Sequence, residues 1–66
     1  MKLTVNGNVL GYHGSPDVAS LLVSLGLADK RVVVELNGAI VGKTRQAATA
    51  IKDGDAVEIV RLVGGG

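Results

Sequence analysis

The chain lacks cysteine, tryptophan and phenylalanine, and it has one histidine, one proline and one tyrosine among its 66 residues. Without cysteine there is no disulfide framework, no thiolate nucleophile and no zinc finger, and one histidine among scattered carboxylates argues against a structural metal. A chain of this length buries only about 60% of the surface that its unfolded form exposes. We therefore expect one sheet with one or two helices, too small to enclose a large cofactor.

Strong net charge and long apolar runs are also missing. Seven Lys and Arg against six Asp and Glu give a formal net charge of +1, and they lie singly apart from Lys30-Arg31. Nucleic-acid-binding domains usually carry a basic stripe and aromatic stacking platforms, which this chain does not have. The apolar runs are too short for a membrane span or a signal peptide. The sequence predicts a soluble cytoplasmic protein that binds neither nucleic acid nor membrane.

The first twelve residues predict a β-hairpin. Met1, Leu3 and Val5 alternate with polar residues, which is the period of a half-buried strand. The pair Asn6-Gly7 follows, and it suits a type I′ turn because both central residues of that turn need positive φ. Residues 8–12 should return as the antiparallel partner.

A helix is predicted over residues 16–25. Ser15 offers a hydroxyl to cap it, Pro16 suits the first helical position, and Asp17 places a carboxylate in the first turn. Gly26 is expected in the left-handed conformation that ends a helix, with Leu27 folding back in a Schellman cap. One apolar stripe runs along the helix: Val18, Leu21, Leu22 and Leu25.

The second half of the chain predicts three more strands. Residues 31–36 are rich in β-branched side chains, and Asn37-Gly38 marks a hairpin to residues 39–41. The segment 42–52 is less regular, with a helical turn expected over 46–50 and Ile51 anchored in the core. After the Asp53-Gly54-Asp55 turn, residues 56–63 form the last predicted strand.

The order of elements is β-β-α-β-β-β, which predicts an α+β fold with two layers, a five-stranded mixed sheet and one main helix on one face. By analogy with such topologies, the first and last strands should lie side by side at the centre of the sheet. The domain is expected to cover residues 1–63, and residues 64–66 to form a flexible glycine tail.

Catalytic side-chain constellations are nearly absent, so we expect a protein that is not itself an enzyme. His13 lies in a predicted loop with no acid or nucleophile near it in sequence. Asp53 and Asp55 flank a glycine, as is typical of a tight turn. The glycines at positions 7, 11 and 14 do not make a phosphate loop, because no Lys-Ser/Thr pair follows them.

The last predicted strand is apolar on both faces. If Val57 and Ile59 point into the core, Val60 and Leu62 point to the other face, where an open sheet meets water. We expect Val33 and Leu10 on that same outer face. A contiguous apolar face of this kind marks a partner surface; the alternative is that the segment 42–52 covers it.

Three glycines, Gly64, Gly65 and Gly66, end the sequence. A frayed terminus is the plain explanation. The alternative is functional: an extended chain without side chains can enter a narrow channel and present its carboxylate to another enzyme. Transferred to AMP, a carboxylate becomes an acyl-adenylate that sulfur or amine nucleophiles attack.

Three segments together resemble the ThiS family of sulfur carriers of thiamine biosynthesis, part of the ubiquitin-like ThiS/MoaD group, and the likeness extends over the whole chain. These are the ending from Val57 to Gly66, the turn from Ile51 to Asp55, and the hairpin of Leu36-Asn37-Gly38 with Ile40-Val41. The resemblance implies a β-grasp fold and a carrier cycle in which the protein is the substrate of an E1-like (ThiF-like) adenylyltransferase.

In that cycle the adenylyltransferase uses ATP and magnesium to adenylate Gly66, and the carrier itself binds no cofactor. A cysteine desulfurase supplies sulfur, and Gly66 becomes a thiocarboxylate that a ThiG-like thiazole synthase consumes. The resemblance further implies that Gly64 and Gly65 enter the partner's active site, and that Val60, Leu62 and Val63 dock on partners.

Two other functions remain open from the sequence. The first is the small subunit of molybdopterin synthase, which has the same fold and tail chemistry and a different sulfur acceptor. The second is a protein modifier or a plain β-grasp interaction module without sulfur chemistry.

Overall fold

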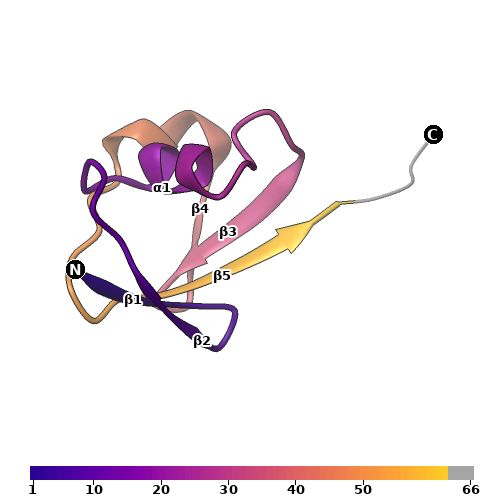
Figure 1. Cartoon of the computed structure of the whole chain (residues 1–66). Helices are drawn as coiled ribbons and strands as arrows, with labels where there is room; N and C mark the ends of the chain where they lie inside the picture. Colours follow the sequence, from indigo (N-terminus) through magenta and orange to yellow (C-terminus); the bar gives the residue numbers. More distant parts are fainter. Residues whose placement is uncertain (63–66) are drawn as a thin grey trace.

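The computed structural model describes residues 1–62, and residues 63–66 lie outside the described part. The elements are β1 (Lys2–Val5), β2 (Asn8–Gly11), α1 (Val18–Ser24), β3 (Val32–Leu36), β4 (Ala39–Val41), the 3₁₀ helix η1 (Lys43–Ala48) and β5 (Ala56–Arg61). The five strands form one sheet in the order β2-β1-β5-β3-β4, with β1 and β5 parallel and the other pairs antiparallel. Both helices lie on one side of it (Figure 1). The predicted order and the central pairing of the first and last strands are confirmed.

Both hairpins turn on an Asn-Gly pair, as predicted. Asn6 and Gly7 have φ of 49° and 83°, and Asn37 and Gly38 have φ of 51° and 86°. Positive φ at both central residues is the type I′ geometry, whose twist matches that of the flanking strands. The turns therefore fix the register of β1 with β2 and of β3 with β4.

The two asparagines also hold β5 through their side chains. The Ile59 N–H donates to Asn6 Oδ1 at 2.7 Å, and Asn6 Nδ2 donates to the Ile59 carbonyl at 3.1 Å. In this way the Asn6 amide acts as one more residue of the short β1–β5 ladder. On the other side of β5, the Ala56 N–H donates to Asn37 Oδ1 at 2.9 Å. We call the contact of Asn6 with Ile59 the first amide clasp and the contact of Asn37 with Ala56 the second.

The helix begins later than predicted. Its N-cap is Asp17, whose Oδ1 accepts the Ser20 N–H at 2.7 Å, so the expectation of a start at Pro16 with a Ser15 cap is wrong. The reason is tertiary: Asp17 is extended and forms an isolated antiparallel bridge with Ala50. This bridge keeps the residues before Val18 out of the helix.

The end of the helix is as predicted. Gly26 has φ of 74°, its N–H donates to the Val23 carbonyl at 3.0 Å, and the Leu27 N–H donates to the Leu22 carbonyl at 2.8 Å. This pair of bonds is the Schellman motif, and it satisfies carbonyls that the helix end leaves without partners.

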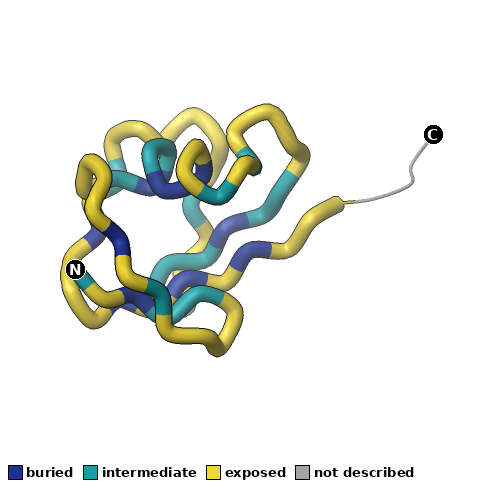
Figure 2. Tube along the Cα trace, in the orientation of Figure 1, coloured by how far each residue is buried: buried dark blue, intermediate teal, exposed yellow. Residues whose placement is uncertain are grey.

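The core lies between the sheet and α1, where Figure 2 shows the buried segments facing one another. Its buried hydrophobic residues are Leu3, Tyr12, Val18, Leu21, Leu22, Val34, Ile51, Val57 and Ile59. Ile51 is thus anchored as predicted. The segment before it differs from the prediction, because the expected turn over 46–50 is a 3₁₀ helix that begins at Lys43. It packs against α1.

The turn before β5 holds a buried carboxylate. Asp55 accepts the Asn37 amide at 3.0 Å and the Lys52 N–H at 2.9 Å, and its carboxylate lies 3.6 Å from Lys52 Nζ. The Asn37 hydrogen bond is the main cause that holds the pKa of Asp55 below its usual value; the Lys52 contacts add to it, and burial opposes it. Because the ionised form is the one that is bound, Asp55 favours the folded state at neutral pH.

The first clasp can be tested by Asn6→Gly, which keeps the positive φ and removes both side-chain bonds. We expect a loss of about 1–2 kcal/mol in the free energy of unfolding, measured by urea denaturation, because each bond contributes about 0.5–1.5 kcal/mol. Asn8→Ala is the control, since its side chain makes one long contact of 3.5 Å. Equal losses in the two variants would contradict a specific role of the Asn6 amide.

The lowered pKa of Asp55 predicts how the stability of the fold depends on pH. Its folded pKa is lowered, so its contribution is present above the unfolded value of about 3.8 and is lost as the pH falls through the folded pKa. Asp55→Asn should be less stable than the wild type at pH 7, and the difference should shrink in acid. Thermal unfolding between neutral and acidic pH measures this, with the exposed Asp29→Asn as control. A constant difference at all pH values would contradict the assignment.

Candidate functional site

The face of the sheet opposite α1 is open and partly apolar. Val57 and Ile59 point into the core, so Val60 points to the outer face, where it lies opposite Val33 on β3. Val60 is 58% exposed. Two further apolar side chains on the edge strands are more exposed: Val9 at 74% and Ile40 at 72%. The predicted outer apolar face therefore exists in the region of Val33 and Val60.

The alternative that residues 42–52 cover this face is wrong. The helix η1 packs against α1, and Figure 1 shows both helices on the other side of the sheet. Leu10 is a second correction: it pairs with Leu3, packs against the core and lies on the helix side. Its place follows from the hairpin register, which puts Val9 on the outer face instead.

Two glutamates lie side by side on the outer face next to Val33 and Val60. Glu35 on β3 is directly opposite Glu58 on β5. Like charges opposite each other across two strands destabilise a sheet. The sequence analysis did not identify this pair: alternation along β5 places Glu58 outward, but the residue opposite depends on the register with β3.

The end of β5 adjoins a hollow of about 190 Å³ on the helix side. Leu62, which is 52% exposed, lines it, and the Leu62 N–H donates to the Arg31 carbonyl at 2.8 Å. Its other lining side chains include three apolar ones and three cations: Leu22, Leu27, Val32, Lys30, Arg31 and Lys43. We call this feature the exit hollow, because the described chain ends beside it.

The predicted docking residues are thus divided between two surfaces. Val60 lies on the outer face and Leu62 lines the exit hollow, although the sequence placed them on one face. The two residues differ because β5 ends at Arg61 and Leu62 follows it outside regular structure, so the alternation of the strand does not extend to Leu62. The predicted site residues Val63, Gly64, Gly65 and Gly66 lie outside the described residues.

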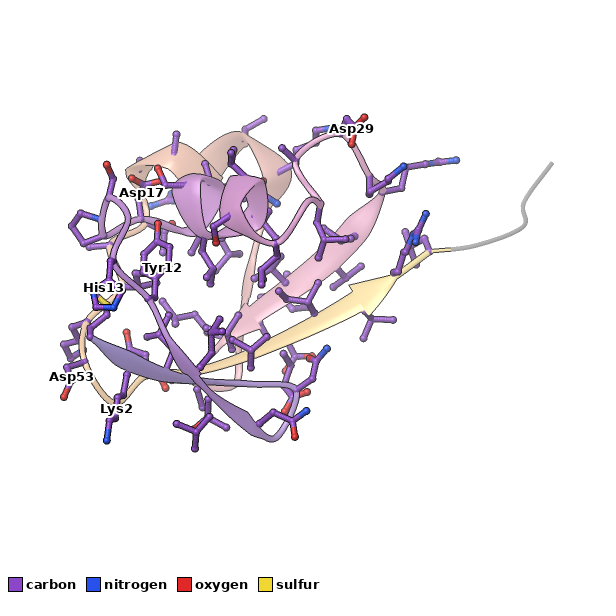
Figure 3. The ribbon with its side chains drawn as sticks, viewed as in Figure 1. Lys2, Tyr12, His13, Asp17, Asp29 and Asp53 are labelled. Atoms are coloured by element: carbon purple, nitrogen blue, oxygen red, sulfur yellow. The ribbon has the colours of Figure 1, made fainter. Side chains whose placement is uncertain are left out.

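The residues that the sequence analysis assigned to turns and loops do not assemble into a catalytic or metal site. Asp53 Oδ1 accepts the Lys2 N–H at 2.6 Å, and His13 is exposed in the loop before α1. Figure 3 shows Asp17, Asp29 and Asp53 at separate places on the fold. Within residues 1–62 no three His, Cys, Asp or Glu side chains are grouped as metal ligands.

Among residues 1–62, no helix has the length and apolar composition needed to span a membrane, since α1 has 7 residues and η1 has 6.

Comparison with known proteins identifies the family. The model of the ThiS family matches residues 3–66. The chain belongs to the ThiS family. It is 45% identical to the sulfur carrier protein ThiS of Bacillus subtilis over 97% of this chain and 98% of that one.

Solved ThiS structures agree with the fold. The crystal structure of the thiamine biosynthesis protein ThiS from Geobacter metallireducens superposes with a TM-score of 0.84, at 43% identity and over the full length of both chains. The ubiquitin-like β-grasp fold implied by the resemblance is therefore confirmed.

Two further relatives are longer proteins. The thiazole synthases of Paramagnetospirillum magneticum and Magnetococcus marinus are 44% and 33% identical to the whole of this chain. The chain spans about a fifth of the length of each, 20% in both cases. In these proteins a ThiS-like segment shares one polypeptide with the rest of a protein named thiazole synthase.

The glutamate pair of this ThiS chain can be tested through stability. Glu58→Gln removes one charge and should raise the free energy of unfolding by about 0.2–1 kcal/mol, because it relieves the cross-strand repulsion. Glu35→Gln should have the same effect, and the double variant should gain little over either single one. Urea denaturation at low salt measures this, and fully additive gains would contradict direct repulsion between the two side chains.

Proposed function

We propose that this protein is a sulfur carrier of thiamine biosynthesis and that its working group is the Gly66 carboxylate. An E1-like, ThiF-like adenylyltransferase with ATP and Mg²⁺ is its first partner. The carboxylate attacks the α-phosphate of ATP and releases pyrophosphate, which gives an acyl-adenylate. The protein thereby acts as a substrate of this enzyme and has no cofactor of its own.

Sulfur then replaces the nucleotide. A persulfide charged by a cysteine desulfurase attacks the acyl carbon, and AMP leaves. The product is an acyl disulfide between Gly66 and the protein that carried the persulfide. A thiol attacks the sulfur of that protein and forms a disulfide with it, so that Gly66 leaves as a thiocarboxylate. A ThiG-like thiazole synthase is the proposed acceptor of this sulfur.

The observation that carries this proposal is the end-to-end match with ThiS of Bacillus subtilis, 97% of this chain against 98% of the relative. The two relatives named thiazole synthase support the choice of acceptor, because in them a similar segment is covalently joined to the remainder of that protein. Where two proteins are fused in some organisms, the same two proteins are expected to act together when they are separate chains.

The described geometry is compatible with this role. The glycine-rich end follows Leu62 at the margin of the fold, where the chain leaves the sheet beside Arg31. The outer face and the exit hollow both adjoin this point, and they offer the exposed side chains of Val60 and Leu62, respectively, to a partner. Gly64 and Gly65 carry no side chains that would obstruct a narrow entrance to an active site.

The alternative function is that of the molybdopterin synthase small subunit, a carrier that donates its sulfur to a different acceptor. The match to the ThiS family favours thiamine biosynthesis over it. Co-purification separates the two: a thiazole synthase partner supports the proposal, and a molybdopterin synthase large subunit overturns it. A plain interaction module is separated by the sulfur-loading assay that follows.

Intact mass spectrometry tests the carrier chemistry. After incubation with ATP, Mg²⁺, the adenylyltransferase, the desulfurase, cysteine and a thiol, the protein should gain the mass difference of one sulfur for one oxygen. Deletion of Gly66 should abolish the gain and leave the thermal unfolding transition unchanged, because the buried core consists of residues between Leu3 and Ile59. His13→Ala is the control and should load normally. Loading of the Gly66 deletion would contradict the assignment of the reactive carboxyl group.

A further inference from the structure

The exit hollow combines an apolar interior with cations that form no ion pair with a described residue. Leu22 is buried, Leu27 and Val32 are half-buried, and the three cations around them are exposed. Among residues 1–62 the only ion pair joins Lys52 to Asp55, so Lys30, Arg31 and Lys43 are not neutralised by another described residue. A hollow of this composition is complementary to an apolar side chain accompanied by carboxylates.

The position of the hollow decides what can reach it. Residues 63–66 span at most about 13–14 Å when fully extended. An enzyme that takes Gly66 into its active site must therefore bring its own surface to within that distance of Leu62, and Leu62 lines the hollow. The hollow therefore lies within reach of the partner surface that the proposed function requires.

We propose that the exit hollow docks an acidic segment of the adenylyltransferase, with a large apolar side chain seated against Leu27 and Leu62 and carboxylates facing Lys30, Arg31 and Lys43. This inference rests on the proposed function and adds the chemistry of the partner surface. A free phosphate or nucleotide is the less suitable occupant, because it would leave the apolar interior of the hollow in contact with water.

The chain offers a matched pair of cations for the test. Lys43 and Arg45 lie two residues apart on η1, and both are exposed. Lys43 lines the hollow and Arg45 does not. Reversal of either charge changes the net charge of the protein equally, so a difference between the two variants reports the position of the charge and not its amount.

Binding to the purified adenylyltransferase should be measured by calorimetry for the wild type, Lys43→Glu, Arg45→Glu and Lys43→Arg. We expect Lys43→Glu to weaken binding about tenfold or more, Arg45→Glu about threefold or less, and Lys43→Arg to bind as the wild type does. The wild-type affinity should fall with added salt, and that of Lys43→Glu should fall less steeply. Thermal unfolding of each variant verifies that the fold is kept.

Equal weakening of binding by Lys43→Glu and Arg45→Glu, or weakening by neither, overturns the docking site. The proposed function is unaffected by that result if the wild-type protein is still loaded with sulfur. Wild-type protein that neither binds nor loads overturns the proposed function, and the docking site with it. The last experiment titrates the free carrier with inorganic pyrophosphate and follows its backbone amides by NMR. Amide shifts at Lys30 and Lys43 at micromolar pyrophosphate would identify a phosphate site and overturn the acidic segment; unchanged spectra support it.

Discussion

The central position of β5 is the constraint on which the rest of this structure depends. The parallel β1–β5 pairing is short, with Thr4 opposite Ala56 and Val5 opposite Val57. The amide clasps of Asn6 and Asn37 add side-chain hydrogen bonds at both edges of β5. Both asparagines already occupy positive-φ turn positions, so the residues that form the hairpins also join each hairpin to the strand that arrives last in the sequence.

A central β5 gives its two faces different surroundings. Val57 and Ile59 face α1 and complete the core, while Glu58 and Val60 face outward. The strand then ends beside Arg31, on the edge of a hollow between the sheet and the helices. The carrier chemistry that we propose for the terminal carboxylate needs such an arrangement: the core fixes β5, and β5 fixes the position of Leu62, the last described residue.

Electrostatics distinguishes the two surfaces near that point. The outer face carries the opposed pair Glu35 and Glu58, and the exit hollow carries Lys30, Arg31 and Lys43. A net charge of +1 conceals this separation. Complementary charges on a partner set its orientation and its rate of encounter more than its final affinity, so two surfaces of opposite sign favour one docking orientation over others.

The sequence by itself determined the local features, namely the Asn-Gly turns, the Schellman end of the helix at Gly26 and the alternation along β5, because each depends on neighbouring residues only. It also indicated the family. Tertiary structure decided what depends on distant segments. The bridge between Asp17 and Ala50 moved the start of the helix, and strand register placed Leu10 against the core and Glu58 opposite its like charge. The exit hollow likewise exists only because segments far apart in the sequence meet there, which no local pattern records.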